Sequence, residues 1–169
     1  STFKTISSRG FEIKGYGTGV SAGDWNKDGV PDILVSGIGD PVILMSGDGE
    51  WSNQVVEMGL LSTTDRTTTW GTSVMDFDND GDEDIWMAAG PIFYPENDGM
   101  LPNAAKQKDG IFVYENGAFV SPSWAFSDVR NTRSVVSADF NRDGSWDVVV
   151  NPIDGPVEIY WGVCDENNW

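Results

Sequence analysis

The sequence has no histidine and a single cysteine among its 169 residues. Without histidine the chain lacks Ser-His-Asp and Cys-His nucleophile systems, histidine general bases and histidine-ligated zinc or iron. One cysteine, Cys164, forms neither an internal disulfide nor a cysteine-rich metal site. We interpret Cys164 as a small, partly buried side chain, because no histidine is present to activate its thiol.

Basic residues are also scarce: 10 lysines and arginines face 27 acids, for a formal charge of −17. A chain so acidic repels nucleic acid and anionic membranes, so we expect neither as a partner. Membrane insertion is not expected either, because no run approaches about 18 consecutive apolar residues. Eight tryptophans and eight phenylalanines are too many for a disordered acidic tail. We therefore expect one folded domain over residues 1–169.

Helical periodicity is hard to find, and an internal repeat is found instead. Residues 24–32, 76–84 and 139–147 share the pattern D-x-[DN]-x-D-G-x-x-D, with an apolar run after each copy. The second position is aromatic in all three copies: Trp25, Phe77 and Phe140. Repetition at this spacing places one supersecondary unit in each copy.

Short strands are predicted on both sides of each loop. A strand candidate precedes each loop, and runs of β-branched or large apolar residues come after it, with Gly- or Pro-containing turns between them. Ser46-Gly-Asp-Gly and Glu115-Asn-Gly are typical of hairpin turns. Residues 92–110 match no repeat and are interpreted as an insertion loop. The predicted strands are Val20–Gly23, Ile33–Ser36, Val42–Met45, Thr72–Met75, Ile85–Ala88, Ile111–Tyr114, Ser134–Ala138, Val148–Val150 and Val157–Trp161.

The loop pattern predicts three calcium sites. Spaced carboxylates around a glycine suit a hard cation with oxygen ligands, and a flexible set of carboxylates suits Ca²⁺ better than Mg²⁺. Positions 1, 3, 5 and 9 would offer side-chain oxygens, and position 7 its backbone carbonyl. The candidate ligands are Asp24, Asn26, Asp28, Val30 and Asp32 in the first loop, Asp76, Asp78, Asp80, Asp82 and Asp84 in the second, and Asp139, Asn141, Asp143, Ser145 and Asp147 in the third.

The loops differ from EF-hands. An EF-hand requires a bidentate glutamate at position 12, where this chain has Val35, Met87 and Val150. The alternative is that the segments are plain acidic turns. Three in-frame copies argue against that, and the four carboxylates of the second loop would repel one another without a cation. The first and third loops have one asparagine each and are expected to bind more weakly.

These motifs resemble the FG-GAP/VCBS repeats of integrin-α-type β-propellers, and most closely the branch of the cartilage acidic (ASPIC/UnbV-associated) proteins. Tyr16-Gly-Thr-Gly-Val-Ser-Ala-Gly-Asp-Trp resembles the strand and loop that open such propellers. The segment from Ala138 to Val157 resembles a late repeat, and Asn167-Asn-Trp resembles the stretch after such a repeat. The resemblance implies an all-β, propeller-type fold with calcium in each loop.

The chain departs from that family in the number of its repeats. Propellers close with about four to eight blades, whereas this sequence has three loops. We therefore expect about three blade units in an incomplete or shortened propeller. Its open edges could reflect a fragment, missing internal residues, or a subunit that closes or extends by association.

The expected function is that of a non-enzymatic, calcium-stabilised binding or scaffold module whose partner is an extracellular protein or glycan. Extracellular modules bind calcium at about 10⁻⁴–10⁻³ M, which suits the millimolar calcium outside cells, so we expect a secreted or cell-surface location. One alternative is a self-assembling subunit of a filament or surface layer.

A second alternative is a lectin-like propeller, in which exposed tryptophans stack on sugar rings, although packing in the core is the commoner role of such residues. An enzyme is the weakest option, because the ordered acids are already assigned to the loops and no nucleotide-binding glycine pattern enters a helix. The tryptophans considered are Trp51, Trp70, Trp124, Trp161 and Trp169.

Overall fold

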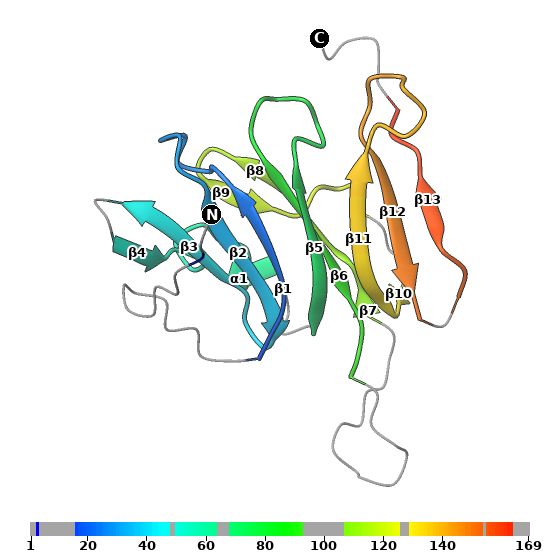
Figure 1. Cartoon of the computed structure of the whole chain (residues 1–169), viewed down its shortest axis with the longest axis horizontal. Helices are drawn as coiled ribbons and strands as arrows, with labels where there is room; N and C mark the ends of the chain where they lie inside the picture. The colour runs from blue at the N-terminus through cyan, green and yellow to red at the C-terminus, as the bar shows by residue number, and fades with distance from the viewer. Residues whose placement is uncertain are drawn as a thin grey trace, which may run out of the picture.

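The computed structural model describes residue 3 and residues 16–47, 50–63, 68–92, 107–125, 129–153 and 155–163. Cys164, Trp169 and most of the expected insertion loop lie outside these ranges. The described chain is all-β, as predicted, and forms three main antiparallel sheets that lie side by side (Figure 1). None of these sheets closes on itself.

Each of the three sheets is built from consecutive strands around one repeat loop. Sheet 1 contains β1–β4 in sequence order, sheet 2 contains β5, β6, β8 and β9, and sheet 3 contains β11–β13. The bounds are β1 Tyr16–Gly23, β2 Asp32–Ile38, β3 Val42–Gly47, β4 Glu50–Asn53, β5 Thr69–Met75, β6 Asp84–Ala89, β8 Gly110–Glu115, β9 Ala118–Val120, β11 Thr132–Ala138, β12 Asp147–Pro152 and β13 Glu158–Tyr160.

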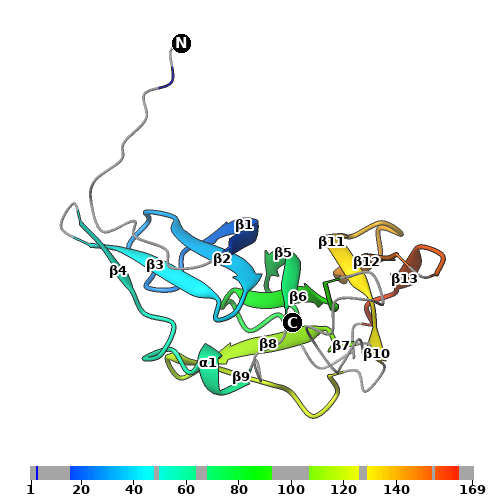
Figure 2. The same cartoon turned by 90° about the horizontal axis from the view of Figure 1, so that it is seen from below.

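All nine predicted strands are present, and most are longer than expected. Sequence reasoning named no strand at β4 or β9, but the hairpin turns that it predicted after Ser46 and Glu115 are present as the antiparallel pairs β3–β4 and β8–β9. It missed the small sheet formed by β7 (Gln107–Lys108) and β10 (Val129–Arg130). It also missed α1 (Leu60–Thr63), a single helical turn that lies next to β9 (Figure 2). At the described end of the expected insertion, Gln107 and Lys108 form β7 and Gly110 begins β8, which leaves residues 93–106 as its undescribed part.

The first strand of each sheet lies beside the first strand of the next one, so that β5 sits between β1 and β11. Two glycines permit this close approach. A Cβ atom on Gly19 would clash with the carbonyl oxygen of Trp70, and a Cβ atom on Gly71 would lie 2.9 Å from the Cα atom of Ser134. Each of these first strands also has a register shift near the close approach. A β-bulge of this kind bends and twists a strand.

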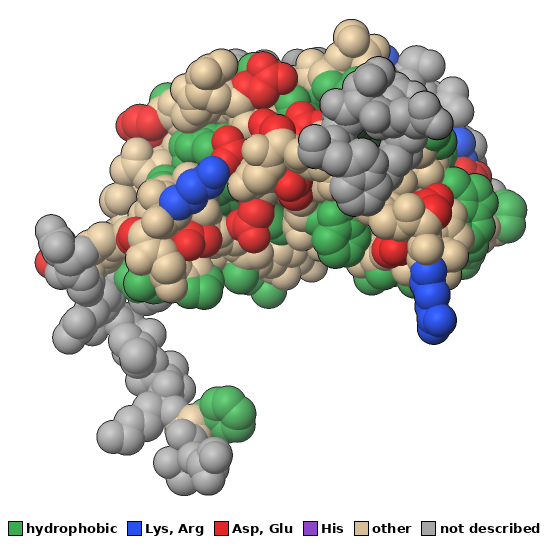
Figure 3. Space-filling model, turned by 90° about the horizontal axis from the view of Figure 1, so that it is seen from above, with side chains coloured by type: hydrophobic (Ala, Val, Ile, Leu, Met, Phe, Trp, Pro, Cys, Tyr) green, Lys and Arg blue, Asp and Glu red, His purple; other side chains and the backbone are tan. Residues whose placement is uncertain are grey.

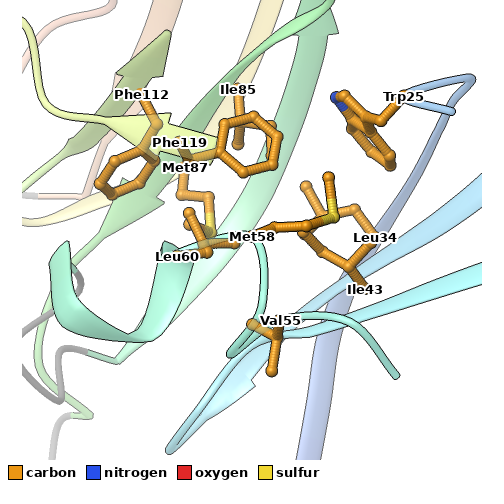
Figure 4. Close-up of a cluster of buried hydrophobic side chains, with 10 residues drawn as sticks. All are labelled: Trp25, Leu34, Ile43, Val55, Met58, Leu60, Ile85, Met87, Phe112 and Phe119. Atoms are coloured by element: carbon orange, nitrogen blue, oxygen red, sulfur yellow. The ribbon is translucent and has the colours of Figure 1, made fainter. Parts of the chain in front are cut away.

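Two apolar clusters fill the spaces between the sheets. The larger one lies between sheets 1 and 2 and is completed by the segment from β4 to α1 (Figure 4). The smaller one lies between sheets 2 and 3 and consists of Trp86, Ile111, Val148 and Val150. The larger cluster consists of Trp25, Leu34, Ile43, Val55, Met58, Leu60, Ile85, Met87, Phe112 and Phe119.

No helix among the described residues is long and apolar enough to cross a membrane.

Candidate metal site: three acidic loops

The three acidic loops connect the first and second strands of their sheets, at one common edge of the molecule (the upper edge in Figure 1). Their backbones have the same conformation. Position 4 is left-handed in each loop, with φ of 56° at Lys27, 59° at Asn79 and 65° at Arg142. The glycine at position 6 is left-handed as well, with φ between 83° and 92°. Such a backbone explains why glycine is needed at position 6.

The carboxylate at position 1 organises the turn of each loop. Its two oxygens accept hydrogen bonds from the backbone N–H groups of positions 5 and 6. In the second loop, Asp76 accepts from Asp80 and Gly81, at 3.0 Å in both cases. The first and third loops repeat these two bonds at 2.9–3.1 Å. The short polar side chain at position 1 therefore shapes the loop before any ion is considered.

Positions 3 and 5 continue the same scheme. The position-3 oxygen accepts from the N–H of position 5, and the position-5 oxygen accepts from the N–H of position 7, the latter at 2.8 Å in all three loops. In the first and third loops the position-3 asparagine also donates to the position-5 carboxylate, at 3.0 Å and 2.8 Å. That extra bond offsets part of the negative charge, and the second loop has no equivalent amide.

The aspartate at position 9 is buried in every loop. Asp32, Asp84 and Asp147 are at most 1% exposed. One oxygen accepts from the N–H of position 2, and the other accepts from an N–H on the third strand or just beyond it: Ser46, Tyr114 or Gly162. We expected position 9 to close a metal shell. Its hydrogen bonds give it a further role, which is to tie the start of the loop to the neighbouring strand.

Three carboxylates of the second loop meet at one point. Single oxygens of Asp76, Asp78 and Asp84 all lie within 4.8 Å of one another. Burial is the main cause that raises the pKa of Asp84 to about 7, against two backbone hydrogen bonds that lower it. The pKa of Asp78 is raised by burial and by the charge of Asp80. The loop thus holds negative charge in a place where the ionised form is disfavoured unless a cation is near.

The first and second loops are joined to each other. Lys27, at position 4 of the first loop, forms a salt bridge with Asp82, which raises the pKa of the lysine. The backbone N–H of Asp24 donates to a carboxylate oxygen of Glu83 at 2.5 Å, and the Trp25 indole donates to the Glu83 carbonyl at 2.8 Å. These contacts hold the two acidic loops at a set separation. Sequence reasoning missed them because the partners are more than fifty residues apart.

The tryptophans proposed as sugar platforms differ in their exposure. Trp70 has Arg133 stacked at 4.3 Å from its ring centroid and donates its indole N–H to Gly90, so that it has a structural role. Trp51 is half-buried. Trp124 and Trp161 are 51% and 54% exposed, and their chain neighbours Ala125 and Tyr160 pack against the same apolar cluster. Among the described candidates, Trp124 and Trp161 are therefore the exposed ones.

Stability in a chelator is expected to fall as the pH rises from about 4 to about 7. The folded state raises the pKa of Asp84 to about 7, so between roughly pH 4 and 7 it binds more protons than the unfolded chain. Asp32 is shifted in the same direction, chiefly by burial. Thermal melts at several pH values measure the slope. Asp84→Asn should make the melting temperature depend less steeply on pH, whatever the overall stability of the variant. A melting temperature of the parent protein that rises over this pH range would contradict the prediction.

No protein-family model matches the sequence, and no curated protein is significantly similar to it.

Proposed function

We propose that this protein is a non-enzymatic, calcium-stabilised binding or scaffold module of the FG-GAP/VCBS type, built from three propeller-like blade units and acting outside the cell. The observation that carries the proposal is the agreement of the three loops in backbone conformation and hydrogen bonding. In the second loop this scheme also brings three carboxylate oxygens within 4.8 Å of one another, and no such group is found among the described residues of the first and third loops.

The donor set of the second loop fits a hard divalent cation. Asp76, Asp78 and Asp84 bring oxygens from three residues together, and Asp80 lies on the same loop. Oxygen ligands in a flexible arrangement are those that Ca²⁺ prefers. A bound cation would place a positive charge beside the buried Asp84 carboxylate and would so stabilise its ionised form. The loops themselves, already shaped by backbone hydrogen bonds, need little rearrangement to present these oxygens.

The role proposed for calcium is structural. Each loop joins two strands, and its position-9 aspartate reaches the third strand of the same sheet or the residues just beyond it. Neutralising the loop would therefore stabilise the whole sheet. Three Ca²⁺ ions would bring the formal charge from −17 to about −11. Sites of this type commonly bind at about 10⁻⁴–10⁻³ M, which supports a location where calcium is millimolar.

The glycines at position 6 allow each loop to be tested separately. Gly29, Gly81 and Gly144 have left-handed backbones, and each donates its N–H to the position-1 carboxylate of its own loop. In a titration followed by amide NMR, Ca²⁺ is expected to shift all three glycine resonances, the Gly81 resonance at the lowest concentration. Mg²⁺ at the same concentrations should shift them far less.

The matched variant is Asp78→Asn/Asp80→Asn. Asparagine keeps the side-chain oxygens that accept from the N–H groups of residues 80 and 82, and it removes two charges. This variant should weaken calcium binding at Gly81 by at least about tenfold, or about 1.4 kcal/mol. Gly29 and Gly144 should respond as in the parent protein. If no glycine resonance of the parent shifts at millimolar calcium, the calcium proposal is wrong.

A further inference from the structure

The two interfaces between neighbouring sheets repeat one arrangement. Each sheet has two faces. We define its leading face as the face that carries the side chain at position 11, counted from the first aspartate of the loop; this is the second residue of the apolar run that follows the loop. On sheet 1 this residue is Leu34, which pairs across strands with Ser21 and Ile43. On sheet 2 it is Trp86, which pairs with Ser73 and Ile111. Leu34, Ile43, Trp86 and Ile111 are at most 3% exposed, because the next sheet covers each face.

The corresponding face of sheet 3 is uncovered. Its position-11 residue is Val149, which pairs with Val136 and Ile159. Val136 is 54% exposed and Ile159 is 48% exposed, and Trp161, two residues further along the same side, is 54% exposed. Figure 3 shows hydrophobic side chains gathered at this end of the molecule. No described residue packs over Val136, Ile159 or Trp161 as sheet 3 packs over sheet 2.

At two positions the leading face of sheet 3 has a different residue from the covered leading faces of sheets 1 and 2. The glycine that allows close backbone approach, Gly19 in sheet 1 and Gly71 in sheet 2, is replaced by Ser134 in sheet 3. The serine that forms a hydrogen bond to the next sheet, Ser21 in sheet 1 and Ser73 in sheet 2, is replaced by Val136. Sheet 3 therefore lacks the glycine and the serine that the covered faces use to contact the next sheet, and it presents the apolar side chain of Val136 instead. Concentrated apolar and aromatic area is typical of the buried centre of interfaces between molecules.

The opposite end of the row of sheets, the outer side of sheet 1, is partly exposed. On sheets 2 and 3 the face opposite to the leading one carries Ile85, Met87, Val148 and Val150, all at most 3% exposed. On sheet 1 the same side carries Ile33 and Val35, which are half-buried, and Val20, which is 69% exposed and pairs with Val35. Val42 and Leu44, which pair with Val35 and Ile33 on this side, are at most 9% exposed. We call this side of sheet 1 its trailing face. The leading face of sheet 3 and the part of the trailing face of sheet 1 around Val20 thus remain exposed at the two ends.

We propose that the leading face of sheet 3 binds the trailing face of sheet 1 of a second copy of this chain. The contact joins unlike surfaces, so it is head-to-tail: repeated copies either close into a ring or extend as a filament. It continues the order in which the sheets already pack within one molecule. Val136, Ile159 and Trp161 would supply the leading side, and Val20, Ile33 and Val35 the trailing side.

The net charge of −17 opposes this association. The strand β13 has one acid, Glu158, which pairs with Arg130. The side chains assigned to the two faces are uncharged. Repulsion between whole molecules is long-range and is screened at physiological salt, where the Debye length is about 8 Å. Added salt is therefore expected to strengthen the association.

Sedimentation velocity from about 1 µM to about 1 mM protein tests the proposal, in millimolar calcium and separately in EGTA. The parent chain is expected to increase in mean mass with concentration. Val136→Lys on the leading face and Val20→Lys on the trailing face should each weaken association at least tenfold. Both residues are exposed, so both variants are expected to fold. Val56→Lys, at a 64% exposed position outside both faces, is the control and should associate like the parent.

Mixing the two single variants separates head-to-tail contact from every other mode. Val136→Lys keeps its trailing face and Val20→Lys keeps its leading face, so the mixture should form dimers and nothing larger. A parent that stays monomeric throughout, a mixture that forms no dimer, or variants that associate as strongly as the parent would each overturn the proposal. The NMR titration of the loop glycines is read separately, so failure of the calcium proposal is distinguishable from failure of this one.

Discussion

Replacing Asp147 by alanine is expected to lower the free energy of unfolding by about 2–5 kcal/mol in a chelator, and by at least as much with calcium. The carboxylate is completely buried and accepts from the backbone N–H groups of Phe140 and Gly162, at 2.8 Å and 2.9 Å. Alanine would leave both donors without this acceptor, and each buried donor left unpaired costs about 1–3 kcal/mol. Urea unfolding measures the loss.

Asp32→Ala should behave in the same way, because Asp32 is equally buried and accepts from Trp25 and Ser46. The control is Asp143→Asn in the third loop. Asparagine keeps the oxygen that accepts from Ser145, so in a chelator this exposed change should cost less than about 1 kcal/mol. If Asp147→Ala is harmless in a chelator and harmful only with calcium, then position 9 serves mainly the cation and the structural role is wrong.

Millimolar calcium is expected to raise the melting temperature by roughly 10 °C over the value in excess EGTA. At about ten times its dissociation constant, one ion stabilises the fold by about 1.4 kcal/mol, and three sites together by about 4 kcal/mol. For a chain of this size, each kcal/mol corresponds to about 2–4 °C. Differential scanning calorimetry or circular dichroism measures the shift, and the expected effect of magnesium is much smaller.

The Asp78→Asn/Asp80→Asn variant provides an internal comparison for that melt. It removes two charges that repel in the chelated state, so in EGTA it should melt no lower than the parent. With calcium it should gain less, because its second loop binds weakly. An unchanged melting temperature of the parent in calcium would mean that the three loops are acidic turns held by backbone hydrogen bonds alone.

The repeat loops and the strands around them could be predicted because their signals are local. The position-1 aspartate and position-6 glycine act within one turn, and the apolar runs after each loop are too regular to be anything but strands. The hairpin turns that lead into β4 and β9 could be predicted as well, but not the two strands themselves. Glu50–Asn53 has no apolar alternation, and Ala118–Val120 is only three residues long, so both depend on pairing with a neighbour.

The role of position 9 shows what a motif alone does not distinguish. A carboxylate that binds a cation and a carboxylate that accepts two backbone N–H groups require the same residue at the same spacing. Only the position of Ser46, Tyr114 and Gly162, far along the chain from each loop, reveals the second role. The contacts of Lys27 and Glu83 between loops were hidden for the same reason.

Because the two apolar clusters differ in size, one sheet is expected to unfold before the others. Sheets 1 and 2 share ten buried residues, whereas sheets 2 and 3 share four. In a row of units that contact only their neighbours, partial unfolding begins where the nearest-neighbour coupling is weakest. Sheet 3 is therefore the unit whose amides open first in native-state hydrogen exchange, while sheets 1 and 2 form the cooperative unit that sets the global stability.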